Sequence, residues 1–73
     1  MRRYPISDQL RQILIDARVA KGLKQTELAK LLGRSQPFVS NYERGQRRID
    51  VAEFIEIARM VGLDPVEVVA DLS

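Results

Sequence analysis

The side chains best suited to recognition chemistry gather between residues 36 and 44. Gln36, Asn41 and Arg44 carry the amide and guanidinium groups that make paired hydrogen bonds. Glutamine and asparagine can each bond adenine at two points, and arginine can do the same to guanine. If the segment is helical, Pro37, Ser40, Asn41 and Arg44 fall on one side of it, with Gln36 at its N-terminus. We expect this side to face outward, free to enter the major groove of a double helix.

The opposite side of the same segment is suited to packing. Val39, Tyr42 and Glu43 fall there and should face the core. We expect the Tyr42 ring to pack inside, with its hydroxyl near the surface. Phe38 lies between the two sides, and two interpretations remain open for it. Its ring is either partly buried beside a turn or in contact with nucleic acid.

The composition gives catalytic chemistry little support. The chain contains no cysteine and no histidine, which removes thiol nucleophiles, the commonest general base and the commonest metal ligand. Its acidic residues occupy predicted helix caps and solvated faces, and the sequence has no glycine-rich phosphate loop. We therefore expect a protein that is not an enzyme and takes no metal and no cofactor.

At 73 residues and 8.3 kDa, the chain has room for one small domain. No apolar run exceeds three residues, so the sequence predicts no membrane segment and no secretory signal. The simplest expectation is a soluble cytoplasmic protein.

Charge is divided unevenly along the chain. Residues 1–48 carry eleven lysines and arginines against four acids, residues 49–73 carry one arginine against six acids, and the overall charge is +2. This division suggests one side that faces a polyanion and another that faces elsewhere. The alternative is an ordinary solvated surface that happens to be segregated.

Apolar residues recur at helical spacing almost throughout the chain. The first predicted helix is capped by Ser7 or Asp8 and ends at Lys21 and Gly22. Four more are predicted, at about Gln25–Leu32, Gln36–Arg44, Val51–Val61 and Pro65–Asp71.

The fourth predicted helix begins with a capping box of Asp50 and Glu53. Apolar residues of the last two helices should face inward, and they are Val51, Phe54, Ile55, Ala58 and Val61, followed by Val66, Val69 and Leu72. The predicted fold class is all-α, with five short helices around one core. A single domain should cover residues 6–73, after a flexible tail at residues 1–5 that carries Arg2 and Arg3.

The second and third predicted helices are separated only by Gly33, Arg34 and Ser35. Gly33 suits the left-handed backbone that ends a helix, and Ala29 is small enough to let the two helices approach. Helices joined by so tight a turn cross steeply, which is the geometry of a helix-turn-helix. We place this motif at about residues 25–44.

The stretch Gln25–Gly45 reads QTELAKLLGRSQPFVSNYERG. It resembles the Cro/repressor helix-turn-helix family, also called the xenobiotic-response-element family, in its Gln, Glu-Leu-Ala, turn Gly, Ser-Gln, Val-Ser and closing Glu-x-Gly. The resemblance extends from Arg18 to Pro65, about fifty residues. It implies a lambda-repressor-like, five-helix domain that binds double-stranded DNA, usually as a dimeric transcriptional regulator.

The resemblance also implies which residues contact DNA. Positions matching Gln36, Pro37 and Asn41 read bases in related repressors, although Pro37 can offer only an apolar surface, for example to a thymine methyl. Gln25 holds a phosphate in the family, and an anion is expected at a helix N-terminus. We predict base readout by Gln36, Pro37, Ser40, Asn41 and Arg44. We predict phosphate contacts by Lys24, Gln25, Arg34, Gln46, Arg47 and Arg48. For Arg34, and for Ser40 and Asn41, a merely solvated surface is the alternative.

Two further features follow from the resemblance. Arg18 and Glu43 resemble a pair that the family keeps as a salt bridge between helices. The C-terminal region commonly forms the two-fold contact in the family, which predicts a homodimer. Apolar residues that lie off the predicted core stripes there are Ile57, Met60 and Val68. Partial burial within the monomer is the alternative for these three.

Two functions remain in competition. The favoured one is a sequence-specific transcriptional regulator, a repressor, that binds a palindromic operator as a dimer through the major groove. It would lie at the nucleoid when bound and would have no small-molecule effector domain. The alternative is a protein-interaction module of the same fold, an antitoxin or coactivator-like bridge, which Pro37 and Phe38 keep open.

Overall fold

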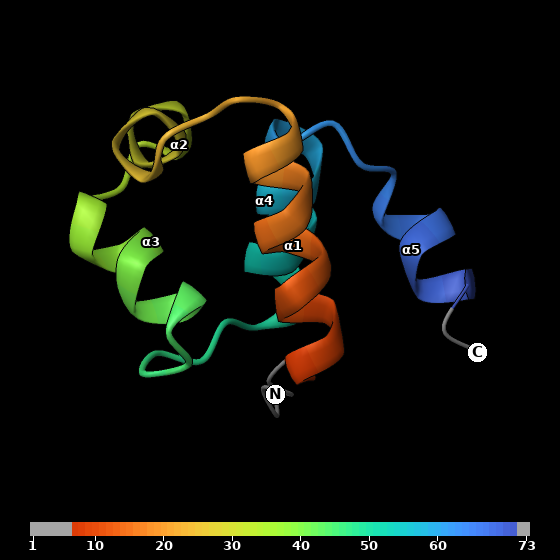
Figure 1. Cartoon of the computed structure of the whole chain (residues 1–73). Helices are drawn as coiled ribbons and strands as arrows, with labels where there is room; N and C mark the ends of the chain where they lie inside the picture. Colours follow the sequence, from red (N-terminus) through yellow and green to blue (C-terminus); the bar gives the residue numbers. More distant parts are fainter. Residues whose placement is uncertain (1–6, 72–73) are drawn as a thin grey trace.

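The computed structural model describes residues 7–71, and this range contains five α-helices (Figure 1). They are α1 Asp8–Ala20, α2 Gln25–Leu32, α3 Gln36–Glu43, α4 Val51–Met60 and α5 Pro65–Asp71. The all-α prediction is confirmed. The predicted tail with Arg2 and Arg3, and the predicted core residue Leu72, lie outside the described residues. Within residues 7–71, no helix is both long and apolar enough to cross a lipid bilayer.

Local side-chain contacts explain where the helices begin. The Ser7 hydroxyl accepts a hydrogen bond from the Leu10 amide at 3.3 Å at the start of α1. At the start of α4, the Asp50 carboxylate accepts from the Glu53 amide at 2.8 Å, and Glu53 accepts in return from the Asp50 amide at 3.0 Å. α2 has a weaker start, because its N-cap, Lys24, makes no side-chain cap bond. The C-terminal ends of the helices also agree with the predicted ends, except that α3 and α4 each stop one residue earlier than predicted.

The turn between α2 and α3 depends on Gly33. Its φ of 68° is left-handed, and the Arg34 amide that follows donates to the Ala29 carbonyl at 2.9 Å. Any side chain at this φ would be strained. In Figure 1, α2 is seen almost end-on while α3 runs across the view, so the two helices cross steeply. This is the predicted helix-turn-helix, with the small Ala29 buried beside the crossing.

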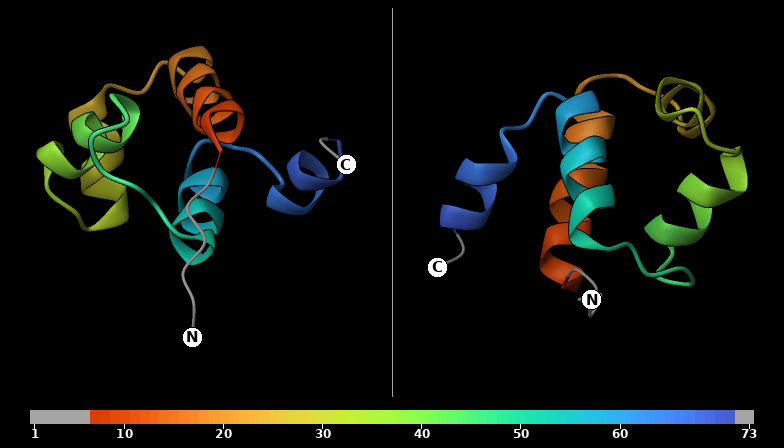
Figure 2. Two further views of the ribbon diagram at one scale, coloured as in Figure 1. Left: turned by 90° about the horizontal axis from the view of Figure 1, so that it is seen from below. Right: turned by 180° about the vertical axis from the view of Figure 1, so that it is seen from behind.

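The core is built by α1 to α4, the loop before α4 and Val61, which directly follows α4. Its buried members are Leu14, Leu28, Ala29, Leu32, Phe38, Val39, Tyr42, Ile49, Phe54, Ile57, Ala58 and Val61. α5 packs mainly on α4 and stands to the side of the other helices (Figure 2). No α5 residue is fully buried within the described range; Val68 is partly buried against the core.

The predicted inward faces of α4 and α5 are therefore partly wrong. Val51, Val66 and Val69 are exposed, and Ile55 is half-buried. The physical reason is that α5 has one principal neighbour, so a single side of this short helix is covered. An apolar stripe indicates which residues share a side, and it does not supply an element to cover them.

The prediction for the Tyr42 hydroxyl is also wrong. The whole side chain is buried, and its hydroxyl has no hydrogen-bond partner among the described residues. Burial, assisted by the neighbouring Glu43 carboxylate and opposed by Arg18, raises the pKa of Tyr42 above its ordinary range. A buried hydroxyl without a partner costs stability.

An ion pair connects α1 to α3. Arg18 Nε lies 2.6 Å from Glu43 Oε2, and Arg18 Nη2 donates to Glu43 Oε1 at 3.1 Å. The third guanidinium nitrogen, Nη1, donates to the Leu23 carbonyl at 2.6 Å. The two side chains are only 13% and 6% exposed. The pair therefore lies where one charge without the other would be costly.

Replacing Tyr42 by phenylalanine should raise the free energy of unfolding by about 1 kcal/mol, because it removes a buried hydroxyl without a partner.

The raised pKa of Tyr42 also predicts that stability depends on pH. Below about pH 10, where unfolded tyrosine ionises, Tyr42 is neutral in both states and the free energy of unfolding does not depend on its ionisation. Above this pH the unfolded state loses the tyrosine proton more readily than the folded state, so the free energy of unfolding falls. Urea unfolding at pH 7 and above pH 10 tests both statements. A less stable Tyr42→Phe, or equal alkaline losses in both proteins, would contradict them.

Replacing Glu43 by alanine should lower the free energy of unfolding by roughly 3–5 kcal/mol, because it leaves the buried Arg18 charge unpaired. Urea unfolding measures the loss. Asp8→Ala is the matched control, since the Asp8 side chain, which pairs with Arg11 at 3.3 Å, is 90% exposed and its pair should be worth at most about 1 kcal/mol. Equal losses in the two variants would show that the Arg18–Glu43 pair is not effectively buried.

Candidate nucleic-acid interface

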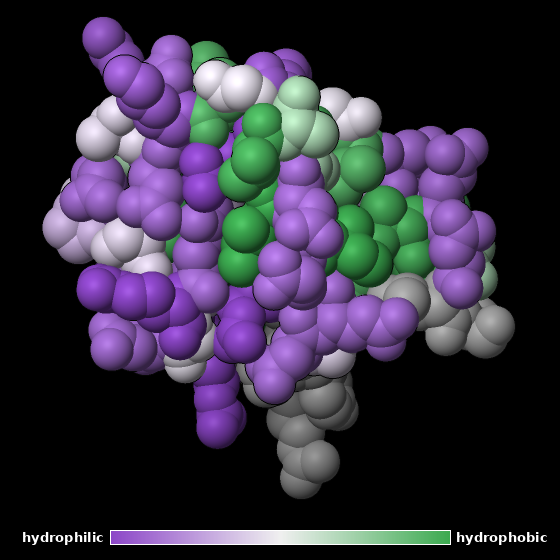
Figure 3. All heavy atoms as spheres, viewed as in Figure 1, coloured by the Kyte–Doolittle hydropathy of each residue, from purple (hydrophilic) through white to green (hydrophobic). Residues whose placement is uncertain are grey.

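The outer side of α3 presents the residues predicted to read bases. These are Gln36, Pro37, Ser40, Asn41 and Arg44. Gln36, Pro37 and Arg44 are exposed and the other two are half-exposed, while Val39 and Tyr42 behind them are buried. Hydrophilic side chains dominate this side of the molecule, and apolar ones gather over α1 and toward α5 (Figure 3). α3 therefore has the two sides that its sequence predicts.

Three of these outward residues are joined to one another. Arg44 Nη2 donates to Asn41 Oδ1 at 3.0 Å and approaches Ser40 Oγ at 3.4 Å. The guanidinium group thus folds back along α3 and leaves the Asn41 amide nitrogen able to donate outward. Bidentate readout of guanine by Arg44 would require it to release these contacts.

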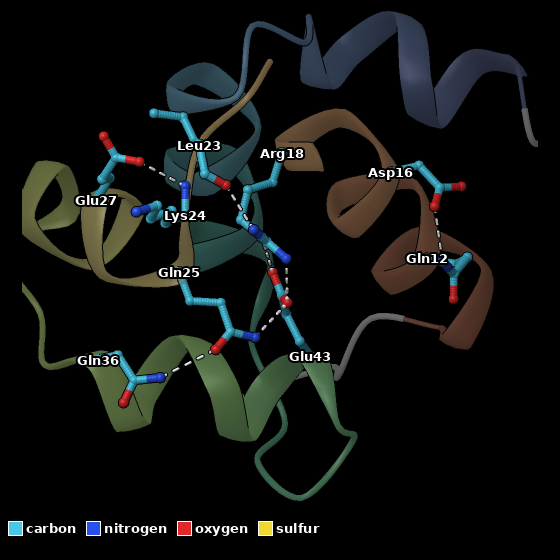
Figure 4. A network of polar contacts seen from close by, with 9 residues as sticks. All are labelled: Gln12, Asp16, Arg18, Leu23, Lys24, Gln25, Glu27, Gln36 and Glu43. Atoms are coloured by element: carbon cyan, nitrogen blue, oxygen red, sulfur yellow. Dashed lines mark hydrogen bonds and ion pairs between the residues drawn. The ribbon is translucent and has the colours of Figure 1, made fainter. Parts of the chain in front are cut away.

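A chain of hydrogen bonds links the start of α3 to the inter-helix ion pair (Figure 4). Gln36 Nε2 donates to Gln25 Oε1 at 3.1 Å, and Gln25 Nε2 donates to Glu43 Oε1 at 2.8 Å. The predicted phosphate contact, the first predicted base contact and the predicted salt bridge are therefore one connected group. The sequence places these residues on three helices, and it does not indicate that Gln25 contacts Gln36 or Glu43.

Phe38 packs within the protein. Its ring is buried and lies 5.7 Å from the Tyr42 ring, centre to centre. The guanidinium groups of Arg34 and Arg47 cover it, at 4.8 Å and 4.5 Å from the ring centre. Of the two interpretations left open by the sequence, the structure shows the packed one.

Glu53 holds two of the predicted phosphate-binding arginines. It lies 3.5 Å from Arg34 Nη2 and 3.2 Å from Arg47 Nη2. The two arginine side chains are still 42% and 38% exposed, so each can reach an anion from its ion pair. The sequence assigns Glu53 only to a helix cap. Its contacts with Arg34 and Arg47 depend on how the loop before α4 folds back, which no local pattern specifies.

The remaining predicted phosphate contacts flank α3. Lys24, Gln46 and Arg48 are exposed. The Gln46 and Arg47 amides both donate to the Asn41 carbonyl, at 2.9 Å and 3.1 Å, which holds the loop on the end of α3. Lys24 and Arg48 thus add exposed cations outside α3 itself.

One further cation at this end of the molecule, Arg11, was not among the predicted site residues. Arg11 of α1 packs its guanidinium group directly against Gly45, in the space that a Cβ would occupy. With Arg47 and Arg48 it lines a hollow of about 390 Å³ beside the loop. The positive φ of Gly45 was predictable from its place after α3, but the approach of Arg11 was not.

One of the three predicted dimer residues needs correction. Ile57 is 1% exposed, so it has no surface to offer a partner, and Met60 and Val68 are partly buried against the core. The exposed apolar residues of this region instead line a groove of about 320 Å³ between α4 and α5, which we call the α4–α5 groove. Its lining residues are Val51, Phe54, Ile55, Arg59, Pro65, Val66 and Val69.

Known proteins are similar to this chain in fold and in sequence. Residues 14–68 match the family model described as Helix-turn-helix. A structure described as an XRE-family like protein from Pseudomonas syringae is 45% identical, with a TM-score of 0.84 over 88% of this chain and 78% of its own. The restriction-modification controller protein C.AhdI from Aeromonas hydrophila is 36% identical, with a TM-score of 0.71 over 81% of this chain and 89% of its own.

A curated relative is the ImmF control region 10 kDa protein of Bacillus phage phi105. It is 38% identical over 56 residues, which are 77% of this chain. The matched part spans 62% of the phage protein's length. The family match covers more than half of the chain and includes the turn and both helices of the motif. The chain therefore belongs to the helix-turn-helix family of the Cro/C1, or XRE, type, whose members are DNA-binding regulators.

Proposed function

We propose that this protein is a transcriptional repressor that binds a palindromic operator as a homodimer, with α3 in the major groove. One observation carries the proposal. The outer side of α3 displays an amide at its first residue, Gln36, and a second amide and a guanidinium group further along, while Phe38, Val39 and Tyr42 are buried. In helix-turn-helix proteins the N-terminal residues of the second helix contact base edges.

Backbone contacts would hold α3 in register. Lys24 and Gln25 lie at the N-terminus of α2, where unpaired amides and the helix dipole favour a phosphate. After α3, Gln46 and Arg48 are exposed and Arg47 is partly exposed within its ion pair. Arg34, in the turn before α3, is likewise partly exposed within its ion pair. Such contacts position the protein without reading sequence and make binding depend on salt.

The α4–α5 groove supports the proposed dimer. It is apolar, its rim includes the exposed Val66, and it belongs to the half of the chain that carries six acids against one arginine. Acidic helices are repelled by DNA, so this surface is suited to a second copy on the side away from the operator. A two-fold axis there would place the two α3 helices on successive major grooves, about 34 Å apart.

Of the two residues that favoured the protein-interaction module, Pro37 and Phe38, only one still does. Phe38 is buried, which leaves Pro37 as the exposed apolar residue on the outer side of α3. A groove for a protein segment should be apolar, and this side is polar. The proposal also includes repression as the direction of control and the cytoplasm as the place of action.

Selection from a random DNA pool, followed by anisotropy titrations over a salt series, tests the function. We expect a palindromic consensus whose affinity falls steeply with salt. Placed over a reporter promoter, the selected operator should lower transcription in the presence of the protein. Gln36→Ala and Asn41→Ala should each relax selection at a base pair, by about 1–3 kcal/mol.

Arg48→Ala is the matched control for these two variants. It should weaken binding about equally for all sequences and reduce the salt slope by about one. A pool that yields no consensus, with only weak salt-sensitive binding, would contradict sequence-specific regulation and favour the interaction module.

Sedimentation with and without operator tests the dimer. We expect the wild type to sediment as a dimer on the operator, and Val66→Glu to weaken dimerisation because it puts a charge in the α4–α5 groove. Val19→Glu is the matched control, since Val19 is a similarly exposed valine on α1 outside this groove. Monomer alone in every sample, or equal effects of the two variants, would rule out this dimer surface.

A further inference from the structure

The hollow of about 390 Å³ beside the loop before α4 is formed by three segments of the chain. Arg11 comes from the first turn of α1, Tyr42 from the end of α3, and Arg47 and Arg48 from the loop. The start of α1, the end of α3 and this loop lie at the lower end of the molecule in Figure 1. The volume of the hollow falls within the range of small-molecule sites, which is about 300–1,000 Å³.

Arg11 is held in a defined position at the hollow. Its Nη1 lies 3.3 Å from Asp8 Oδ1, and its guanidinium group packs directly against Gly45, in the space that a Cβ would occupy. The Gly45 φ of 77° is also left-handed, so both the backbone and the arginine exclude a side chain there. A guanidinium group that is already fixed loses less conformational freedom when it binds an anion.

The hollow is positively charged. Among the described residues, three guanidinium groups and one carboxylate, that of Asp8, line it. The Asp8 side chain is 90% exposed, so solvent screens its charge. Arg47 also contacts Glu53 and the Arg48 carbonyl, and 38% of its side chain remains exposed. Guanidinium groups bind phosphate through paired N–H donors, so this cluster is suited to an anion.

Tyr42 adds a donor of a different kind. It lines the hollow, its side chain is buried, and its hydroxyl has no hydrogen-bond partner among the described residues. The surrounding arginines cannot accept the hydroxyl proton, because guanidinium groups only donate. An anionic oxygen can accept from the hydroxyl and from the arginines together. The buried hydroxyl that costs stability in the free protein would thus gain a partner on binding.

We propose that this hollow binds a small phosphate-bearing molecule, with Arg11, Arg47 and Arg48 around the phosphate group and the Tyr42 hydroxyl donating to one of its oxygens. A phosphate monoester carries a charge of about −1.5 to −2 at pH 7 and offers three acceptor oxygens, which suits this set of donors. The site lies within the DNA-binding domain, so it needs no separate effector domain.

Occupancy of the hollow should oppose DNA binding. Arg47 and Arg48, which line it, are also proposed contacts of the operator backbone. A phosphate group that engages these two side chains competes with the operator for them, so a phosphate-bearing molecule would release the protein from DNA. This consequence rests on the proposed function, whereas binding in the hollow does not.

Calorimetric titration of the protein without DNA, at constant ionic strength, tests the site. The probes are inorganic phosphate and dimethyl phosphate, a diester with a single charge. We expect wild type to bind inorganic phosphate with a dissociation constant of about 1 mM or lower, and dimethyl phosphate more weakly. Tyr42→Phe and Arg11→Ala should each weaken phosphate binding by about tenfold or more, because each removes a donor to a charged group.

Arg34→Ala separates the hollow from a general attraction to arginine. Arg34 shares Glu53 with Arg47 and is similarly exposed, at 42%, but it does not line the hollow. We expect its phosphate affinity to equal that of wild type. An equal loss in Arg34→Ala and Arg11→Ala, undiminished binding by Tyr42→Phe, or no binding by wild type would overturn the site.

Operator titrations in phosphate and in chloride of the same ionic strength test the competition. We expect phosphate to weaken the wild-type complex more than chloride does. Arg11→Ala, which is not among the proposed DNA contacts, should lose this difference and bind the operator as wild type does in chloride. Equal effects of the two anions on wild type would overturn the competition. A wild type that binds phosphate but selects no operator would instead overturn the proposed function and leave the site in place.

Discussion

The contacts of one carboxylate, that of Glu43, determine how the recognition helix is presented. Glu43 lies at the end of α3, its ion-pair partner Arg18 lies near the end of α1, and Gln25 begins α2. Arg18 also binds the Leu23 carbonyl in the loop between α1 and α2. The buried pair thus fixes the entry into α2 relative to α3. Since α2 and α3 form the motif, its geometry depends on this carboxylate having its partner.

Some basic residues of the chain form internal ion pairs and others are exposed, and the sequence does not distinguish the two groups. Arg18 is paired with Glu43, and Arg34 and Arg47 are paired with Glu53 while covering Phe38. Lys24 and Arg48 are instead exposed. A count of basic residues therefore overstates the charge that is free to meet a polyanion. The arginines over Phe38 can hold the first turn of α3 and the loop before α4 together and still present part of their surface to a phosphate.

Local chemistry made most of the fold predictable. Ser7, Gly33 and the Asp50–Glu53 box fix helix ends through contacts within a few residues, and the structure has them where the sequence indicates. Predictions that needed a neighbouring element failed more often. Ile57 was assigned to the surface and is buried, while Val66 was assigned to the core and is 75% exposed. A helical wheel gives the grouping of residues, and only the packing of α5 on α4 decides which group is covered.

In the candidate site too, placements that follow from one helix were predictable and contacts between helices were not. The outward placement of Gln36 and Asn41 follows from helical periodicity, and the packed Val39 follows from the same rule. The contact between Gln36 and Gln25 joins residues eleven positions apart across the turn. It depends on the crossing of two helices and could not be derived from spacing alone.

The central claim, that Gln36 on α3 reads a base edge in the major groove, can be tested on the DNA itself. Replacing each adenine of the operator in turn by 7-deazaadenine removes the N7 acceptor from the major groove and leaves base pairing intact. We expect that one such replacement in each half-site weakens wild-type binding and has no further effect on Gln36→Ala. Binding that no 7-deazaadenine weakens, or a loss that is the same in Gln36→Ala, would contradict it.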